Sequence, residues 1–316
     1  MTRTKAFARL AALVVAMLLS ACSEGQRTQE IASPVAPPAE RPDASPSPDI
    51  FRFKIGALEA AALKDGDIDA ANDGKTFGVG LPTEEVSAVL AAAGQPTDTL
   101  HLSIQPLLVR SGPRVLLFDT GAADASFAEA GRLPASLRTA GIEPSQVTDI
   151  FISHGHPDHV GGLLLSDGAL AFPNAAIHVA APKWESLQAD GASADLVSAA
   201  APKVVAFEPG AVILPGLVTA VAVDGHTPGH SAYEIASGDE RLLYIGDAAH
   251  HHVISVQRPE WTIAYDTDAP TAQASRRALL QHAADQHLRV YAVHFPFPGL
   301  GHIRRQGESF AWAPEQ

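Results

Sequence analysis

Cysteine is almost absent from this sequence, which has 316 residues and a single cysteine, Cys22. An intramolecular disulfide is therefore impossible. Basic residues are also few, since 22 lysines and arginines stand against 35 aspartates and glutamates, for a formal net charge of −13. An acidic chain without a basic run argues against nucleic acid as a partner and against the attraction of anionic substrates.

The sequence also lacks an apolar run long enough to cross a membrane. Its most apolar stretch, Leu10 to Leu19, has ten residues, about half of the ~20 that a membrane-spanning helix requires. Three basic residues, Arg3, Lys5 and Arg9, precede it, as the positive region of a signal peptide precedes the hydrophobic region. Residues 1–21 are therefore predicted to be a signal peptide.

The end of this segment, Leu19-Ser20-Ala21-Cys22, resembles a bacterial lipobox, in which the cysteine becomes the lipidated N-terminus after cleavage. The alternative is an ordinary secreted protein with an incidental cysteine. A lipoprotein is favoured because the only cysteine falls at the one position that a lipobox needs. Ser23 follows instead of the aspartate that resembles an inner-membrane retention signal. We therefore expect a protein of the bacterial cell envelope that touches the membrane only through lipid on Cys22, at the outer membrane and facing the periplasm.

A proline-rich stretch separates the lipobox from the rest of the chain. Residues 22–49 contain six prolines and no aromatic residue, so they cannot bury enough surface to fold. They are predicted to form a semi-extended tether. Residues 50–316 are long enough for one sizeable core and are predicted to form one domain. The sequence leaves the oligomeric state open, including a homodimer.

Short apolar runs alternate with helical patterns throughout the predicted domain. Residues 270–286 give the clearest helix, with Arg276 and Arg277 on a side that can stay in solvent. A hairpin is expected to turn at Ser111-Gly112-Pro113. Strands are predicted at residues 51–55, 104–109, 115–118, 177–179, 217–223, 233–235, 242–245 and 289–293, and a second helix at residues 134–140. Because strands outnumber the interspersed helices, the pattern fits two sheets with helices outside.

Histidine and aspartate are concentrated in one segment, Phe151-Ile152-Ser153-His154-Gly155-His156-Pro157-Asp158-His159-Val160-Gly161-Gly162. Residues i and i+2 of an extended segment point to the same side, so His154 and His156 can share one metal ion. Gly155 and Pro157 permit a sharp turn that directs Asp158 and His159 toward a second ion. Imidazole and carboxylate ligands without a thiolate suit zinc or another first-row metal. The alternative, a His-rich surface turn that binds nothing, is disfavoured by the convergence of three imidazoles and a carboxylate.

The pattern His154-x-His156-x-Asp158-His159 resembles the signature of the metallo-β-lactamase superfamily of metallohydrolases. This resemblance implies an α/β fold, namely an αββα sandwich of two mixed β-sheets flanked by helices. Gly225-His226-Thr227-Pro228-Gly229-His230 is similar to the second histidine motif of that superfamily, with His226 expected to be a loop residue or to lie behind the ligands. The resemblance implies a first ion held by His154, His156 and His230, a second held by Asp158, His159 and His294, and Asp247 as the bridge between them.

The same resemblance implies two divalent metal ions per chain, most readily Zn²⁺, with Mn²⁺, Co²⁺ and Fe²⁺ as alternatives. A hydroxide bridging the two ions would attack an activated ester, with Asp247 and Asp158 at the catalytic centre and Asp158 orienting the hydroxide or accepting its proton. His250 is a further catalytic candidate, because it stands where homoserine-lactone hydrolases of the superfamily have a tyrosine. Asp119, in Asp119-Thr120-Gly121, is either a hydrogen-bond partner of a metal-bound imidazole or a turn-former.

Within the superfamily, the local resemblance is closest to methyl parathion hydrolase and its relatives. It rests on Phe172-Pro173-Asn174-Ala175, Asp266-Thr267-Asp268 and Phe295-Pro296-Phe297-Pro298-Gly299-Leu300-Gly301-His302. The favoured function is hydrolysis of a neutral small-molecule ester, which could be an aryl phosphotriester, a carboxyl ester or a lactone. The alternatives are a non-catalytic metal-binding surface lipoprotein and, among enzymes, an N-acyl homoserine lactonase. Four aromatic residues are candidate pocket walls, with core packing as the alternative: Phe172, Trp184, Phe295 and Phe297.

Overall fold

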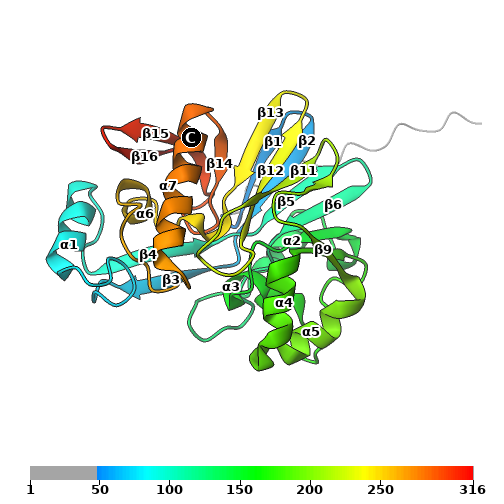
Figure 1. Cartoon of the computed structure of the whole chain (residues 1–316). Coiled ribbons are helices and arrows are strands. Elements are labelled where there is room, and N and C mark those ends of the chain that lie inside the picture. Colours follow the sequence, from blue (N-terminus) through cyan, green and yellow to red (C-terminus); the bar gives the residue numbers. More distant parts are fainter. Residues whose placement is uncertain (1–47, 316) are drawn as a thin grey trace, which may run out of the picture. The chain divides into compact units, whose positions relative to one another are not determined.

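Two seven-stranded β-sheets stack face to face in the computed structural model, which describes residues 48–315 (Figure 1). Both sheets are mixed, because each combines antiparallel and parallel neighbours. Helices cover the outer faces of both sheets. The predicted αββα sandwich is therefore confirmed.

The first sheet has the strand order β1-β2-β5-β6-β7-β8-β9, and the second sheet runs from β10 to β16 in chain order. The strands of the first sheet are β1 (Ile50–Ile55), β2 (Leu58–Leu63), β5 (Leu107–Ser111), β6 (Arg114–Phe118), β7 (Asp149–Phe151), β8 (Ala176–Ala180) and β9 (Val204–Phe207). Those of the second sheet are β10 (Val212–Leu214), β11 (Val218–Ala222), β12 (Ser231–Ser237), β13 (Glu240–Tyr244), β14 (Arg289–Tyr291), β15 (Leu300–Gln306) and β16 (Ser309–Pro314).

The space between the sheets is filled by aromatic side chains from both. Phe118 and Phe151 stack at a centroid distance of 4.8 Å, and both pack against Tyr233 from the opposite sheet. The hydroxyl of Tyr233 donates a hydrogen bond to the carbonyl of Ile152 at 2.6 Å. Burying these rings removes a large apolar surface from water, while the phenol group still finds a partner.

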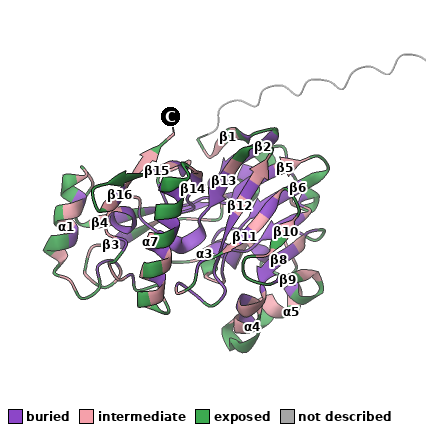
Figure 2. Cartoon of the chain, turned by 45° about the horizontal axis from the view of Figure 1, so that its top comes forward, coloured by how far each residue is buried: buried purple, intermediate pink, exposed green. Residues whose placement is uncertain are grey.

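The outer layers consist of amphipathic helices that bury their apolar sides on the sheets. On the first sheet lie α2 (Leu133–Thr139), α4 (Ala181–Ala189) and α5 (Ala194–Ala200), and on the second lies α7 (Ala269–Asp285); the other helices are α1 (Thr83–Ala92), α3 (Pro157–Val160) and α6 (Ile254–Gln257). In α7, Leu279 and Leu280 pack against the second sheet, whereas Asp268 caps the first turn by accepting a hydrogen bond from the Thr271 amide. Figure 2 shows buried residues concentrated in the strands and exposed residues on the outer sides of the helices.

A two-stranded ribbon, β3 (Gly66–Ala71) and β4 (Thr99–Ile104), extends beside the sandwich. It shares a separate apolar cluster with α1 and α6, in which Phe77, Val86 and Leu90 are almost fully buried. This ribbon matters for the site because the Ser103 amide donates to the carbonyl of His294 at 3.1 Å.

Most of the predicted elements are confirmed, including the hairpin of β5 and β6 and the long helix α7. The prediction that Arg276 stays in solvent is wrong, because its side chain is 1% exposed. The predicted signal peptide, Cys22 and nearly all of the tether lie outside the described residues. Among residues 48–315, no helix has both the length and the apolar character that a membrane span requires.

Candidate metal centre

The carboxyl ends of four strands meet at one edge of the sandwich. In the first sheet β6 and β7 run parallel, and in the second sheet β13 and β14 do. The residues that follow parallel strands lie at the same edge of a sheet. The His-x-His-x-Asp-His segment follows β7, and Pro157 starts the short helix α3 that carries Asp158 and His159.

A first group of ligand atoms surrounds one carboxylate oxygen of Asp247. His154 Nε2 lies 3.5 Å and His226 Nε2 lies 3.4 Å from Asp247 Oδ2, and His156 Nδ1 lies 3.1 Å from His226 Nε2. One possible ligand atom from each of these four residues lies within 4.8 Å of the others. A tetrahedral ion with bonds of about 2.0 Å places its ligands roughly 3.3 Å apart, so these spacings fit zinc.

The second group surrounds the other oxygen of the same carboxylate. Asp247 Oδ1 lies 3.2 Å from His159 Nε2 and 3.1 Å from His294 Nε2. Asp158 completes the group, with Oδ2 3.4 Å from His294 Nε2 and 3.6 Å from His159 Nε2. The two oxygens of Asp247 thus face different groups, as a carboxylate that bridges two ions must.

His226, rather than His230, belongs to the first group, which corrects the prediction. His230 has no nitrogen free for a metal, because its Nε2 accepts the Asp247 amide at 3.0 Å and its Nδ1 faces the Val223 carbonyl at 3.1 Å. Burial lowers the pKa of His230 to about 3, in keeping with a neutral ring. His230 immediately precedes β12 at the base of the loop, whereas His226 lies in its outer part.

The residues present fit a metal ion, because several atoms aimed into the centre have no hydrogen-bond partner. His154 Nε2, His159 Nε2 and Asp247 Oδ1 are buried and unpaired. An unpaired buried polar atom is costly unless a ligand satisfies it. The opposite ring nitrogen of His159 is held by Asp119, and that of His294 by the Ser103 carbonyl, both at 2.7 Å. Such bonds fix the tautomer that presents Nε2 to a metal.

Asp119 is a partner of the ligand histidines, as one of its two predicted roles requires. Its Oδ2 accepts from His159 Nδ1 at 2.7 Å, from Ser153 Oγ at 2.6 Å and from Tyr244 Oη at 2.6 Å. Ser153 Oγ also lies 3.0 Å from His154 Nδ1. One carboxylate therefore orients His159 directly and His154 through a hydroxyl.

The charged and polar neighbours of Asp247 keep its carboxylate ionised. Burial would raise the pKa of Asp247, but the surrounding imidazoles outweigh burial and hold it well below its usual range. Burial lowers the pKa of His154 strongly and that of His156 to about 4. For His159 and His294, burial is outweighed by the nearby carboxylates, which raise the pKa. A metal ion would therefore displace protons from part of the centre.

His250 lies beside both groups, as its predicted position three residues after Asp247 allows. Its Nε2 is 3.2 Å from Asp247 Oδ2, and neither ring nitrogen has a hydrogen-bond partner. The ring of Tyr265 lies 5.7 Å from that of His250, and Tyr265 is 40% exposed. Tyr265, which the sequence did not single out, thus connects the buried centre with solvent.

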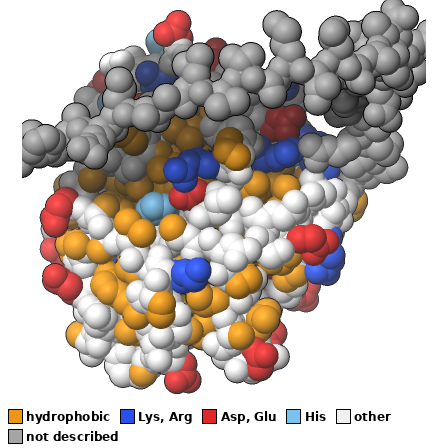
Figure 3. Space-filling model, turned by 90° about the vertical axis from the view of Figure 1, so that its right-hand side faces the viewer, with side chains coloured by type: hydrophobic (Ala, Val, Ile, Leu, Met, Phe, Trp, Pro, Cys, Tyr) orange, Lys and Arg blue, Asp and Glu red, His pale blue; other side chains and the backbone are white. Residues whose placement is uncertain are grey.

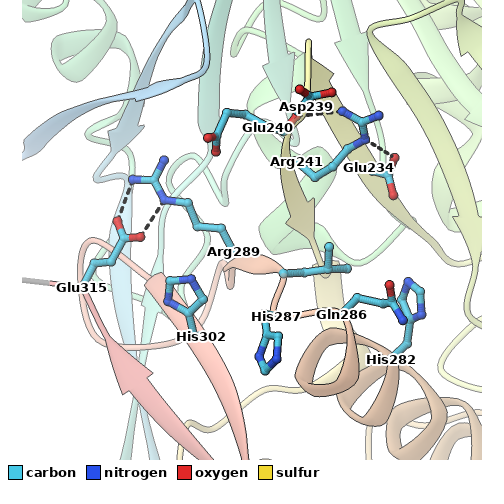
Figure 4. Close-up of a pocket in the computed structure, with 11 residues that line it drawn as sticks. Glu234, Asp239, Glu240, Arg241, His282, Gln286, His287, Arg289, His302 and Glu315 are labelled. Atoms are coloured by element: carbon cyan, nitrogen blue, oxygen red, sulfur yellow. Dashed lines mark hydrogen bonds and ion pairs between the residues drawn. The ribbon is translucent and has the colours of Figure 1, made fainter.

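The predicted aromatic pocket walls belong largely to the core. Phe172 packs in the outer layer of the first sheet, with Trp184 against it, and Phe295 is fully buried beside Trp312. A polar hollow of about 680 Å³ lies elsewhere, along the β12–β13 hairpin and the end of α7 (Figure 4). In it Arg289 pairs with Glu315 and Arg241 with Glu234, and none of the predicted site residues lines it.

Comparison with known proteins identifies the family. Residues 103–294 match the model of the metallo-beta-lactamase superfamily. The structure is similar to that of AidC, a dizinc quorum-quenching lactonase, with a TM-score of 0.80, 30% sequence identity, and coverage of 84% of this chain and 97% of AidC. It is also similar to the hydrolase AbOPH in the beta lactamase superfamily, with a TM-score of 0.76, 29% identity, and coverage of 85% and 98%.

A probable metal-dependent hydrolase from Staphylococcus aureus shares the fold at a TM-score of 0.71 and 21% identity, with coverage of 84% of this chain and 99% of that one. A search of curated proteins finds no match to the sequence. The family model covers more than half of the chain and contains all the residues of both ligand groups. The chain therefore belongs to the metallo-beta-lactamase superfamily of hydrolases.

Proposed function

We propose that this protein is a binuclear-metal hydrolase that cleaves neutral, activated esters of small molecules. The observation that carries this proposal is the pair of ligand groups sharing Asp247, with unpaired buried atoms aimed at the shared space. Two bound divalent ions would supply a nucleophile near neutral pH by lowering the pKa of water, and would polarise the ester oxygen that gains charge. The proposed ligands are His154, His156, His226, Asp158, His159, His294 and Asp247.

The residues of the chain would hold and orient the reactants. Asp158 is slightly exposed, with 13% of its side chain accessible, so it can accept a proton at the edge of the centre as well as hold a metal. His250 would donate a hydrogen bond to a substrate oxygen from Nδ1, because that nitrogen has no hydrogen-bond partner, whereas Nε2 faces Asp247. Tyr265, which is partly exposed and whose ring lies 5.7 Å from that of His250, would be a contact for the entering substrate.

The charge of the protein supports a neutral rather than a polyanionic substrate. The chain is acidic, with a formal net charge of −13. On the face shown in Figure 3, lysine and arginine side chains are scattered rather than joined in a basic groove. Polyanions require such a groove, whereas a neutral ester does not. We therefore propose aryl phosphotriesters, carboxyl esters and lactones as the substrate class.

A specific observation supports lactones as a second candidate within this class. AidC, which is 30% identical over most of this chain, is a dizinc quorum-quenching lactonase. We therefore propose N-acyl homoserine lactone hydrolysis as the second candidate. The first candidate remains ester hydrolysis as in the methyl parathion hydrolase branch, which the segment Asp266-Thr267-Asp268 resembles. In the structure this segment adjoins the centre, since Asp266 Oδ1 lies 3.0 Å from His226 Nδ1.

The proposal is tested with soluble protein that begins after Cys22. Metal-loaded and metal-free forms are assayed on aryl phosphotriesters, p-nitrophenyl esters, lactones and β-lactams. We expect turnover of the first three classes by the loaded form only. No turnover of any ester, with two ions bound, would favour the alternative of a non-catalytic metal-binding protein.

The role of His250 is tested by His250→Phe, with His282→Phe on the exposed side of α7 as the matched control. If His250 donates to the substrate oxygen, turnover should fall roughly 10²- to 10³-fold with unchanged metal content, as for the loss of one oxyanion donor. A rate within about twofold of the wild-type rate would exclude that role.

We also propose that Cys22 carries the lipid that anchors the protein to the outer membrane, with residues 22–49 as the tether. The support is the lipobox-like sequence that ends at the only cysteine.

A further inference from the structure

Arg276 is among the largest fully buried side chains among residues 48–315, and two of its hydrogen-bond acceptors, Ala248 and Asp266, adjoin or contact residues of the metal centre. Its Nε donates to the Ala248 carbonyl at 2.9 Å and its Nη1 to the Pro259 carbonyl at 3.0 Å. Its Nη2 donates to Asp266 Oδ2 at 2.7 Å. A buried charge must be paired and hydrogen-bonded, and here one guanidinium is satisfied by three separate segments.

Asp266 links Arg276 to a ligand histidine, His226. Its side chain is fully buried, and its Oδ1 lies 3.0 Å from His226 Nδ1, the nitrogen opposite the one in the first ligand group. The backbone supports the same contact, since Thr267 N donates to the His226 carbonyl at 2.9 Å and Asp268 N to the Gly225 carbonyl at 2.8 Å. His226 is thus held by the segment that leads into α7.

The start of α7 also presses directly on this loop. Gly225 has a φ of +107°, and a Cβ at this position would lie 2.1 Å from the backbone nitrogen of Ala272 in α7. Only glycine permits this approach. The Nε of Arg276 donates to the carbonyl of Ala248, the residue that follows Asp247. Through Asp266 and Ala248, one side chain therefore contacts the neighbours of two residues of the first ligand group, His226 and Asp247.

We propose that Arg276 is a positioning residue that determines how tightly the first ligand group, His154, His156, His226 and Asp247, binds its metal ion. It acts through Asp266 on His226 and through the Ala248 carbonyl on the Asp247 segment. A buried ion pair is weak evidence for stability, because apolar residues often replace it without loss. Its contacts with two ligand segments point instead to a role in geometry.

The second ligand group has supports of its own. His159 is held by Asp119 at the end of β6, and His294 by the Ser103 carbonyl of β4. None of the hydrogen bonds of Arg276 reaches either support. Because Asp247 belongs to both groups, loss of Arg276 should weaken the first ion strongly and the second ion only slightly.

The experiment compares Arg276→Gln with Arg277→Gln, a matched control that removes the exposed ion pair with Glu260 from the next residue of α7. Zinc-loaded proteins are dialysed against graded concentrations of a chelator, and the ions retained per chain are counted. Cobalt-substituted proteins report the ligand geometry by visible absorption. For Arg276→Gln we expect one ion to be lost at about 10- to 100-fold lower chelator concentration, with a much smaller shift for the second ion, which shares only Asp247 with the first group. Arg277→Gln should match wild type.

Arg276→Lys keeps a charge opposite Asp266 but cannot reproduce the three-way contact, so it should show a smaller shift of the same ion. This variant decides the question if Arg276→Gln does not fold. A merely structural role would lower the melting temperature of the metal-free protein and release both ions together. That result, or wild-type chelator resistance in both variants, would overturn the proposal. The inference rests on the metal site of the proposed function, but no ester is used. If the protein binds two ions but hydrolyses no ester, the proposed reaction is refuted, and the proposal for Arg276 is unaffected.

Discussion

Replacing Asp119 with asparagine should destabilise the metal-free protein and weaken metal binding. Asp119 is fully buried and accepts four hydrogen bonds, from the Ser153 amide at 2.7 Å, Ser153 Oγ at 2.6 Å, Tyr244 Oη at 2.6 Å and His159 Nδ1 at 2.7 Å. Its φ of 57° lies in the left-handed region, which asparagine also adopts readily. The substitution therefore tests the carboxylate and leaves the backbone undisturbed.

The magnitude follows from the donors that asparagine cannot satisfy. Its amide has one accepting oxygen, and its NH₂ group would face donors where Asp119 has an oxygen. The hydroxyls of Ser153 and Tyr244 can rotate away, but a backbone amide and a ring N–H cannot. Loss of one charge-assisted bond costs about 1.5–3 kcal/mol, and one orphaned buried donor costs about 1–3 kcal/mol. We expect Asp119→Asn to lower the free energy of unfolding by about 3–5 kcal/mol, a large part of the ~5–15 kcal/mol of a typical domain.

The assay is denaturant unfolding of the metal-free proteins, followed by counting the ions retained by the loaded proteins. Asp285→Asn serves as the control, because it removes an exposed pair with Arg305 and should cost less than about 1 kcal/mol. If Asp119→Asn unfolds within about 1 kcal/mol of wild type and retains both ions equally well, Asp119 does not organise the centre and the reasoning fails.

Three further predictions concern other parts of the chain. His226→Ala should lose one metal ion, whereas His230→Ala should keep two and lose about 1–3 kcal/mol of stability, because it leaves the Asp247 amide unpaired; equal metal content in the two variants would contradict the assignment. For Asp149, burial is outweighed by hydrogen bonds from His178, Thr148 and Arg114, which lower its pKa to about 2. Its stabilisation is therefore present above about pH 4 and lost as the pH falls toward 2. Asp149→Asn should cost about 1–2 kcal/mol near pH 7, a figure reduced for the half-exposed Arg114, and the difference from wild type should vanish near pH 2 in unfolding curves; a cost independent of pH would refute this. Cys22→Ser, expressed in a Gram-negative host, should lose fatty-acid labelling and leave the membrane fraction; an unlabelled wild-type protein would disprove the lipobox interpretation.

Local sequence predicts those parts of the centre whose geometry is local. His154, His156, Asp158 and His159 follow one another at the end of β7, so their spacing nearly determines their directions. Asp247 and His294 come after apolar strands, and parallel strands bring such residues to one edge. These six residues lie together in the two ligand groups of the structure.

The remaining features depend on contacts that spacing does not show. His226 and His230 lie in one Gly- and Pro-rich loop, and only the pairing of β11 with β12 places His230 at the loop base. Arg276 has the pattern of a solvent-facing helix residue, and its burial depends on how the loop containing Asp266 folds over α7. A helix pattern gives the side on which a residue lies but not whether a loop covers it.

The most direct test of the proposed metal centre is the number of metal ions per chain after reconstitution with excess zinc, cobalt or manganese. We expect two ions in the wild-type protein, because the two oxygens of Asp247 face separate ligand groups. One ion, or none, in the fully reconstituted protein would contradict it.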